Sequence, residues 1–138
     1  MITFNYETDF IAQDENKLSN WVLSVIKSEG FKEVEINYIF CDDDYLLKLN
    51  KEFLNHNTLT DIISFDYSIG KQIHGDIYIS IDRVLENSSK FKVEFSEELR
   101  RVMIHGILHY CGYKDKSESD KKQMREKENH YLTKYSDN

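Results

Sequence analysis

The chain has 138 residues, 40% of them hydrophobic and 13% aromatic, which matches a single domain with a buried core and argues against intrinsic disorder. Its formal net charge of −7 argues against a general nucleic-acid binder, because a basic surface usually supplies the contacts to phosphate. That argument is weaker for the C-terminal third, since residues 1–95 carry 9 basic and 17 acidic side chains whereas residues 96–138 carry 9 and 8.

The first part of the chain alternates between strand and helix patterns. Apolar and polar residues alternate over residues 2–6 and 34–40, which predicts two strands. Between them, residues 14–29 place apolar side chains at helical spacing. Three aspartates at 42–44 suit the positive end of a helix dipole, so we expect a second helix to begin there and to run to about Phe53.

The rest of the chain predicts a hairpin followed by three helices. Two β-rich segments, residues 60–67 and 74–81, are separated by a short turn and should pair with each other. Asp82 is expected to cap the helix that follows. The three helices are expected over residues 83–92, 96–112 and 117–135. The full order predicts one α+β domain over residues 1–138, with a small mixed four-stranded sheet and about five helices.

The segment HGILHYCGYKD, residues 105–115, is the most informative one. His105 and His109 are four residues apart, so on a helix their rings project from one face, one turn apart. Gly112 can end the helix in the left-handed conformation, and the chain can then return Asp115 as a third ligand. Two histidines and a carboxylate leave an open position, as in a catalytic zinc site. The segment therefore predicts one zinc ion per chain, bound on a helix and the loop after it.

Two other interpretations of this segment are open. The histidines could be polar residues on a helix face while Asp115 caps a turn, but the helix is otherwise largely apolar, which makes that arrangement costly. The spacing is also that of metzincin proteases, which carry a glutamate general base directly after the first histidine. Here that position is Gly106, so peptide hydrolysis becomes a minor alternative.

The segment is accompanied by three upstream blocks, LNKEF, TDIISF and HGDIYIS. In this combination, the chain resembles the YbeY family of bacterial rRNA maturation factors over roughly residues 45–128. The resemblance implies a small α+β domain with a zinc site and a single-strand-specific, metal-dependent endoribonuclease activity. It also implies a role in maturation of the 3′ end of 16S rRNA and in late quality control of ribosomes, with ribosomal RNA and the small ribosomal subunit as partners.

The chain departs from the family pattern at three positions. The family usually has a third histidine where this chain has Asp115, and a carboxylate is an acceptable zinc ligand, so we expect the site to survive with altered metal preference. An arginine and a proline of the family are replaced by Leu54 and Leu59. An arginine at position 54 would be a natural phosphate clamp. Lys51 and His56 are the nearest substitutes in sequence.

Five further residues are candidates for catalysis or RNA contact. Asp76 could orient a ligand histidine or act on the attacking water, or it could be a strand-edge aspartate held by backbone. Arg101, one turn before the first histidine of the motif, could catalyse by meeting a phosphate or could be a solvated, salt-bridging arginine. Ser64 could contact RNA phosphate or be a structural hydroxyl. Lys114 and Lys116 belong to a basic cluster that could position the RNA backbone or form a solvated helix face.

We therefore expect a zinc-dependent endoribonuclease located in the cytoplasm. The alternatives are a non-catalytic ribosome-assembly factor with a structural metal and a zinc peptidase. No apolar run approaches the roughly 18 residues of a membrane span, and the N-terminus lacks a signal-peptide pattern. Cys41 and Cys111 form no CxxC pair, so free thiols in a reducing compartment are expected. The oligomeric state stays open.

Overall fold

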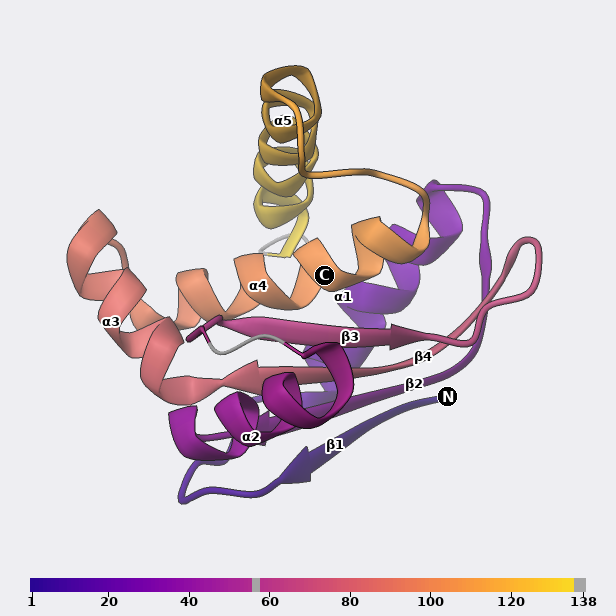
Figure 1. Cartoon of the computed structure of the whole chain (residues 1–138). Coiled ribbons are helices and arrows are strands. Elements are labelled where there is room, and N and C mark those ends of the chain that lie inside the picture. Colours follow the sequence, from indigo (N-terminus) through magenta and orange to yellow (C-terminus); the bar gives the residue numbers. More distant parts are fainter. Residues whose placement is uncertain (56–57, 136–138) are drawn as a thin grey trace.

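The computed structural model describes residues 1–55 and 58–135 (Figure 1). Its strands are β1 (Ile2–Tyr6), β2 (Lys32–Cys41), β3 (Ile62–Asp66) and β4 (Gln72–Ser80). Its helices are α1 (Glu15–Ser28), α2 (Asp43–Leu54), α3 (Ile81–Phe91), α4 (Phe95–Tyr110) and α5 (Glu118–Lys134). The α+β class with a mixed sheet is confirmed, and the bounds of each expected element agree with the structure to within two residues. No helix in the described part of the chain is long and apolar enough to span a bilayer.

The four strands form one sheet in the order β1-β2-β4-β3. β2 pairs in parallel with both β1 and β4, whereas β3 and β4 form the expected antiparallel hairpin. β3 is therefore an edge strand, while β2 and β4 are central strands. This order places the start of β3 beside α4, which carries the two motif histidines.

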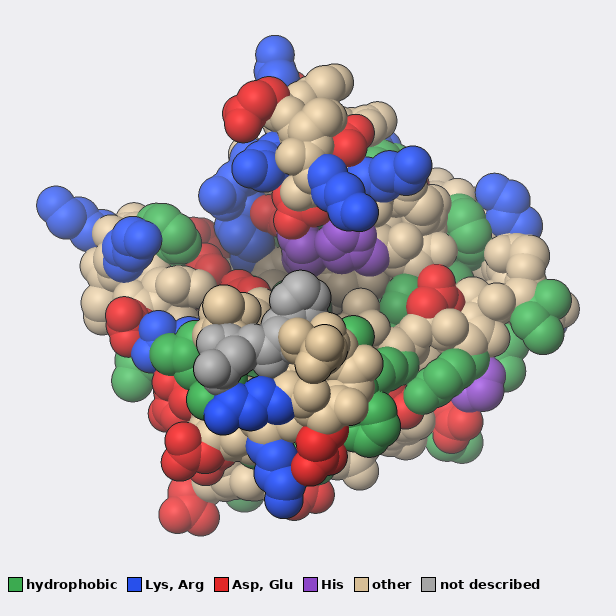
Figure 2. All heavy atoms as spheres, viewed as in Figure 1, with side chains coloured by type: hydrophobic (Ala, Val, Ile, Leu, Met, Phe, Trp, Pro, Cys, Tyr) green, Lys and Arg blue, Asp and Glu red, His purple; other side chains and the backbone are tan. Residues whose placement is uncertain are grey.

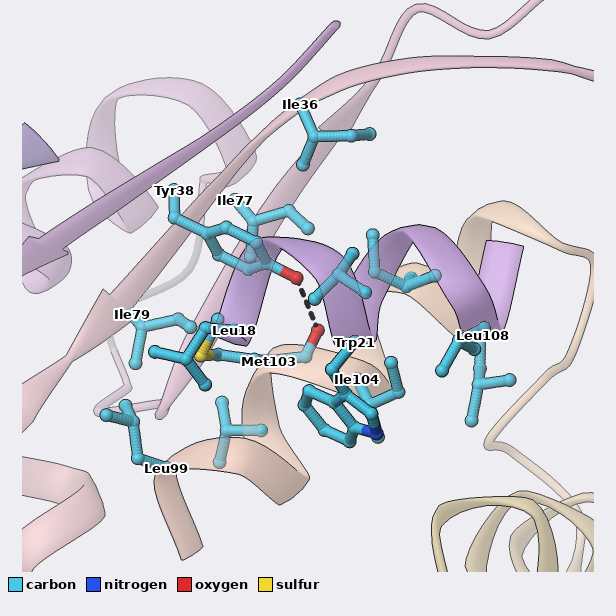
Figure 3. Packing of buried hydrophobic residues seen from close by; sticks show 14 of the residues in the cluster. Leu18, Trp21, Ile36, Tyr38, Ile77, Ile79, Leu99, Met103, Ile104 and Leu108 are labelled. Carbon is cyan, nitrogen blue, oxygen red and sulfur yellow. Dashed lines mark hydrogen bonds between the residues drawn. The ribbon is translucent and has the colours of Figure 1, made fainter. Parts of the chain in front are cut away.

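The two faces of the sheet are covered by different helices. Alternate residues of the central strands point toward α1 and α4 and form the main core. Tyr38 is one of them, and its hydroxyl donates to the Met103 carbonyl of α4 over 3.0 Å, close to Trp21 from α1 (Figure 3). The opposite face packs against α2 in a smaller cluster, which contains Cys41, Leu46 and Ile63. The two motif histidines of α4 are not part of this core and lie on the side of the helix that faces away from the sheet.

Two glycines let α4 lie close to the sheet. A Cβ atom on Gly106 would lie 3.1 Å from the terminal carbons of Ile62 and Ile77, so this position faces the sheet and has little room. A Cβ atom on Gly75 would collide with the ring of Tyr110. The Tyr110 hydroxyl lies 2.9 Å from the Phe65 carbonyl oxygen, which ties the end of α4 to β3.

The cap of α3 differs from the expectation. The helix begins two residues earlier than predicted, because Ser80 rather than Asp82 is its N-cap and accepts from the Arg83 amide over 3.3 Å. The Asp82 carboxylate instead accepts from the Asp43 amide at the start of α2, over 2.9 Å. The prediction for Asp82 was therefore wrong, since its side chain binds the first amide of α2, whose N-cap is Asp42, and does not cap its own helix.

Candidate metal centre

Three possible ligand atoms converge between the last turns of α4 and the loop that leads to α5. The Nε2 atom of His105 lies 3.0 Å from Nε2 of His109 and 3.3 Å from Oδ2 of Asp115. All three ligand atoms lie within 4.8 Å of one another. The structure thus brings together the residues that the motif spacing predicts as ligands.

The other ring nitrogen of each histidine is held by an acceptor. Nδ1 of His105 lies 2.6 Å from a carboxylate oxygen of Glu128, and Nδ1 of His109 lies 2.9 Å from the carbonyl oxygen of Tyr113. Because both partners accept, each Nδ1 donates, and the Nε2 lone pairs are left to face the shared point. The second Glu128 oxygen accepts from Arg101 over 2.9 Å, and Arg101 also donates to Asn129 over 2.8 Å.

This donor set fits a divalent ion of the zinc type. Two nitrogen ligands of a tetrahedral zinc ion are about 3.3 Å apart, given bond lengths of about 2.0–2.1 Å. The separations of 3.0 and 3.3 Å, both measured from Nε2 of His105, are close to that value, and the three ligand atoms together lie within 4.8 Å of one another. Asp115 offers the candidate oxygen ligand from the loop, where its side chain is 40% exposed.

The charged groups around the histidines shift their pKa values in opposite directions. Burial alone would lower the pKa of His105, but the hydrogen bond and negative charge of Glu128 raise it above the ordinary value. Burial and the neighbouring His105 lower the pKa of His109. Glu128 is buried, yet hydrogen bonds from His105 and Arg101 lower its pKa, so it stays an ionised acceptor.

The loop that carries Asp115 is anchored to α1 through Glu29. The Tyr113 hydroxyl donates to one Glu29 oxygen over 2.7 Å, and the Tyr131 hydroxyl of α5 donates to the other. The Lys127 ammonium lies 3.5 Å from the same carboxylate. These hydrogen bonds outweigh burial and lower the pKa of Glu29. Because the Tyr113 carbonyl also orients His109, this cluster connects α1 and α5 to the metal centre.

A cavity of about 360 Å³ opens beside the metal centre, between α3, α4, α5 and the start of β3. His105 and Asp115 form one part of its wall, and Lys121 and Arg125 of α5 lie at the exposed rim. Figure 2 shows histidine side chains in a hollow below α5, bordered by Lys and Arg side chains. The carboxyl groups of Asp61 and Glu98 also line this cavity, and burial raises the pKa of each above its ordinary value.

The other predicted RNA contacts lie on the exposed surface. Lys114 and Lys116 are exposed on either side of Asp115 in the loop. Ser64 is exposed on the edge strand β3, on the same face as Ile62, which lines the cavity. Leu54 is 43% exposed and lines a shallow depression with Ser64. His56 lies outside the described residues.

The two predicted catalytic residues have different positions. Arg101 lines the cavity, but Glu128 and Asn129 hold its guanidinium group, so it contacts the metal centre only through Glu128. Asp76 points to the opposite face of the sheet, where Asn37 donates to its carboxylate over 2.9 Å. The geometry therefore excludes a direct role of Asp76 at this site. Residues 74–80 alternate strictly, but both faces of a central strand are covered, so the pattern did not show which face carried the site.

Sequence reasoning missed Glu128 and Glu98. Glu128 lies on another helix, 23 residues after His105, and no local spacing connects the two. The sequence could have predicted that Glu98 lies near the site, because it lies seven residues, or two helical turns, before His105 and therefore on the same face of α4.

The fold and the site define a small α+β protein with a candidate metal centre of two histidines and one carboxylate beside a polar cavity. Comparison with known proteins identifies the family. A family model described as Endoribonuclease YbeY matches residues 2–136, and the chain belongs to this family. The resemblance indicated by the sequence blocks is thereby confirmed.

Named relatives agree with the family assignment. The chain is 66% identical over 132 residues to the Endoribonuclease YbeY of Flavobacterium psychrophilum, covering 96% of this chain and 94% of the relative. It is 60% identical over 128 residues to that of Flavobacterium johnsoniae, covering 93% and 92%. The solution structure of TM1509 from Thermotoga maritima is similar, with a TM-score of 0.69 and 28% identity, covering 98% of this chain and 89% of that one.

Proposed function

We propose that this chain is a zinc-dependent endoribonuclease that cleaves single-stranded ribosomal RNA. The observation that carries the proposal is the convergence of His105, His109 and Asp115, with both imidazoles oriented by acceptors at Nδ1. Membership of a family whose named relatives are endoribonucleases supports RNA as the substrate. The cavity next to the ligands supports a substrate with a polar group bound at the site.

Different residues would bind the ion and orient its ligands. His105, His109 and Asp115 would hold the ion, which when bound acts as a Lewis acid toward a phosphodiester oxygen and lowers the pKa of water. Glu128 accepts from Nδ1 of His105 and so directs the Nε2 lone pair of the neutral ring toward the ion, while Arg101 positions Glu128.

Binding of the RNA backbone is assigned to cations around the centre. Lys114 and Lys116 flank Asp115, and Lys121 and Arg125 lie at the rim of the cavity, so phosphates on both sides of the scissile bond can be neutralised. Ser64 on the edge strand is a candidate for a further phosphate contact. Leu54 stands where the family has an arginine and offers no charge to a phosphate, so we assign binding of the RNA backbone to the cations of the loop and α5.

For the biological substrate we propose the 3′ end of 16S rRNA in the small ribosomal subunit, in the cytoplasm, with a further role in late ribosome quality control. The net charge of −7 supports a substrate presented on a particle, because an acidic protein binds free RNA weakly.

The decisive experiment is cleavage of precursor 16S rRNA by the purified protein loaded with zinc. We expect endonucleolytic products that disappear with a chelator and with His109→Ala. Zinc content, measured by mass spectrometry of metals, should be near one per chain in the wild type and strongly reduced in His109→Ala. Cleavage that persists in zinc-free His109→Ala protein would contradict the proposal.

A non-catalytic ribosome-assembly factor is the second candidate, because Leu54 replaces the expected phosphate clamp. If a folded His105→Ala protein restores ribosome assembly in cells that lack the gene, the binding role is correct. If precursor rRNA accumulates instead, the nuclease is correct. A peptidase is not supported, since Gly106 faces Ile62 and Ile77 and provides no carboxylate.

A further inference from the structure

The cavity beside the metal centre contains a buried carboxylate that the centre does not use. Glu98 is only 5% exposed and lines the cavity. Within residues 1–55 and 58–135 its carboxylate accepts no hydrogen bond and forms no ion pair within 4.0 Å, since the nearby Arg101 binds Glu128 and Asn129. The charges of Arg101 and Arg125 act on it only from a distance. Because its oxygens face the cavity and are not among the buried, unpartnered atoms of the described residues, they are open to a ligand, and N–H groups of that ligand would supply the missing donors.

The position of Glu98 relative to the metal centre suits a nucleotide. Glu98 and His105 lie on one face of α4, about 10 Å apart along the helix axis. A nucleotide with its phosphate at the metal centre reaches that far with the outer edge of its base. A cavity of about 360 Å³ has room for one nucleoside, not for several.

The apolar and charged side chains of the cavity wall are arranged to complement the parts of a nucleotide. Ile62, Val102 and Met124 give it apolar surfaces, and the ring of Phe91 lines it while 51% exposed. Such surfaces stack on the flat faces of a base. The cations Lys121 and Arg125 lie at the exposed rim, whereas Glu98 and the ion pair of Arg101 with Glu128 line the interior, so phosphates would point outward and the base inward.

A second metal ion would explain the carboxyl groups less well. Among the described residues, His105, His109 and Asp115 are the only group that brings three possible ligand atoms together, so Glu98 and Asp61 do not complete another site. A hydrated cation would also gain nothing from the apolar walls.

The choice among the four bases follows from their hydrogen-bonding edges. An ionised carboxylate is an acceptor at both oxygens. Guanine presents two adjacent donors on its Watson–Crick edge, N1–H and the N2 amino group, whereas adenine, cytosine and uracil each present a single donor group beside one or more acceptors. We propose that the cavity is a guanine subsite in which Glu98 accepts from N1–H and the N2 amino group of a guanine near the scissile bond. This inference rests on the proposed ribonuclease function.

The test uses a single-stranded RNA with a randomised segment, cut by the zinc-loaded protein and sequenced at the product ends. We expect guanine to be enriched about 10-fold over the other bases at one fixed position relative to the cut. Inosine at that position, which lacks the N2 amino group, should reduce the preference. Glu98→Gln should abolish the preference at unchanged zinc content, while Glu97→Gln, the same charge change one residue earlier, should retain it.

A binding experiment separates the subsite from the activity. Guanosine monophosphate should bind the zinc-loaded wild type about 10-fold more tightly than adenosine monophosphate, with inosine monophosphate in between. Failure to cut any RNA, with this order of affinities intact, would contradict the proposed function but support the subsite. Equal cleavage next to all four bases, or equal affinity for the three nucleotides, would overturn the subsite, and neither result depends on the folding of Glu98→Gln.

Discussion

Glu128 connects the metal centre to α5 through its two carboxylate oxygens. One accepts from Nδ1 of His105 and the other from Arg101. Glu128→Gln replaces one of these acceptors by an amide donor, so either His105 or Arg101 loses its partner. Because such a partner fixes the orientation and basicity of a ligand histidine, we expect zinc affinity to fall about 10- to 100-fold. Competition with a chromophoric chelator measures this change.

The control for this substitution lies on the same helix. Glu126 is exposed, two residues before Glu128, so Glu126→Gln makes the same change of charge without touching His105. Its zinc affinity should equal that of the wild type. If Glu128→Gln binds zinc as tightly as Glu126→Gln does, then Glu128 does not orient the ligand.

At the scale of elements, Gly75 sets the distance between α4 and the β3–β4 hairpin. A methyl group there would collide with the Tyr110 ring and with the backbone of Phe65. We expect Gly75→Ala to lower the free energy of unfolding by about 1–3 kcal/mol, measured by urea denaturation. Gly106→Ala is the matched comparison, because the nearest atoms to its methyl group are side-chain carbons of Ile62 and Ile77 at 3.1–3.3 Å and because alanine favours the helix. Equal losses for both variants would contradict this account.

The Glu29 cluster is the second feature at this scale, because it joins α1, α5 and the loop of the metal centre. Glu29→Gln weakens the hydrogen bonds from Tyr113 and Tyr131, so we expect a loss of about 1–2 kcal/mol at pH 7. The folded-state pKa of Glu29 lies below its ordinary value of 4.5, so its stabilisation is present above that pH and is lost as pH falls through the folded pKa. The difference between the two proteins in urea denaturation should therefore shrink in acid. Glu52→Gln, at an exposed position on α2, should show no loss at either pH.

For the whole molecule, the sequence predicts local structure better than spatial neighbours. Hydrophobic periodicity identified the helices and strands, and the spacing of residues 105–115 predicted which three candidate ligand residues lie together, because each signal lies within one segment. The sheet order and the contact between His105 and Glu128 depend on the packing of distant segments. The position of Asp76 relative to the site also could not be predicted from one segment. A central strand alternates in the same way whichever face carries the site, and Asp76 lies on the other face, bound to Asn37.

The charge of the whole molecule determines how RNA binds. With a net charge of −7, attraction to RNA must come from a local group of cations, and Lys114, Lys116, Lys121 and Arg125 surround the metal centre. Four phosphate contacts to a single strand give a slope of about −3 when the logarithm of affinity is plotted against the logarithm of salt concentration. Fluorescence anisotropy with zinc-free protein measures this slope while the RNA stays intact.

Removal of one cation tests whether this local group supplies the attraction. Lys116→Ala should weaken binding to all single-stranded sequences alike and make the slope shallower by about 0.7, since one phosphate contact is lost. Lys48→Ala removes the same charge from an exposed position on α2, which packs on the opposite face of the sheet, and should leave the slope unchanged. If both substitutions reduce the slope equally, the protein attracts RNA through its overall charge and not through the cations beside the metal centre.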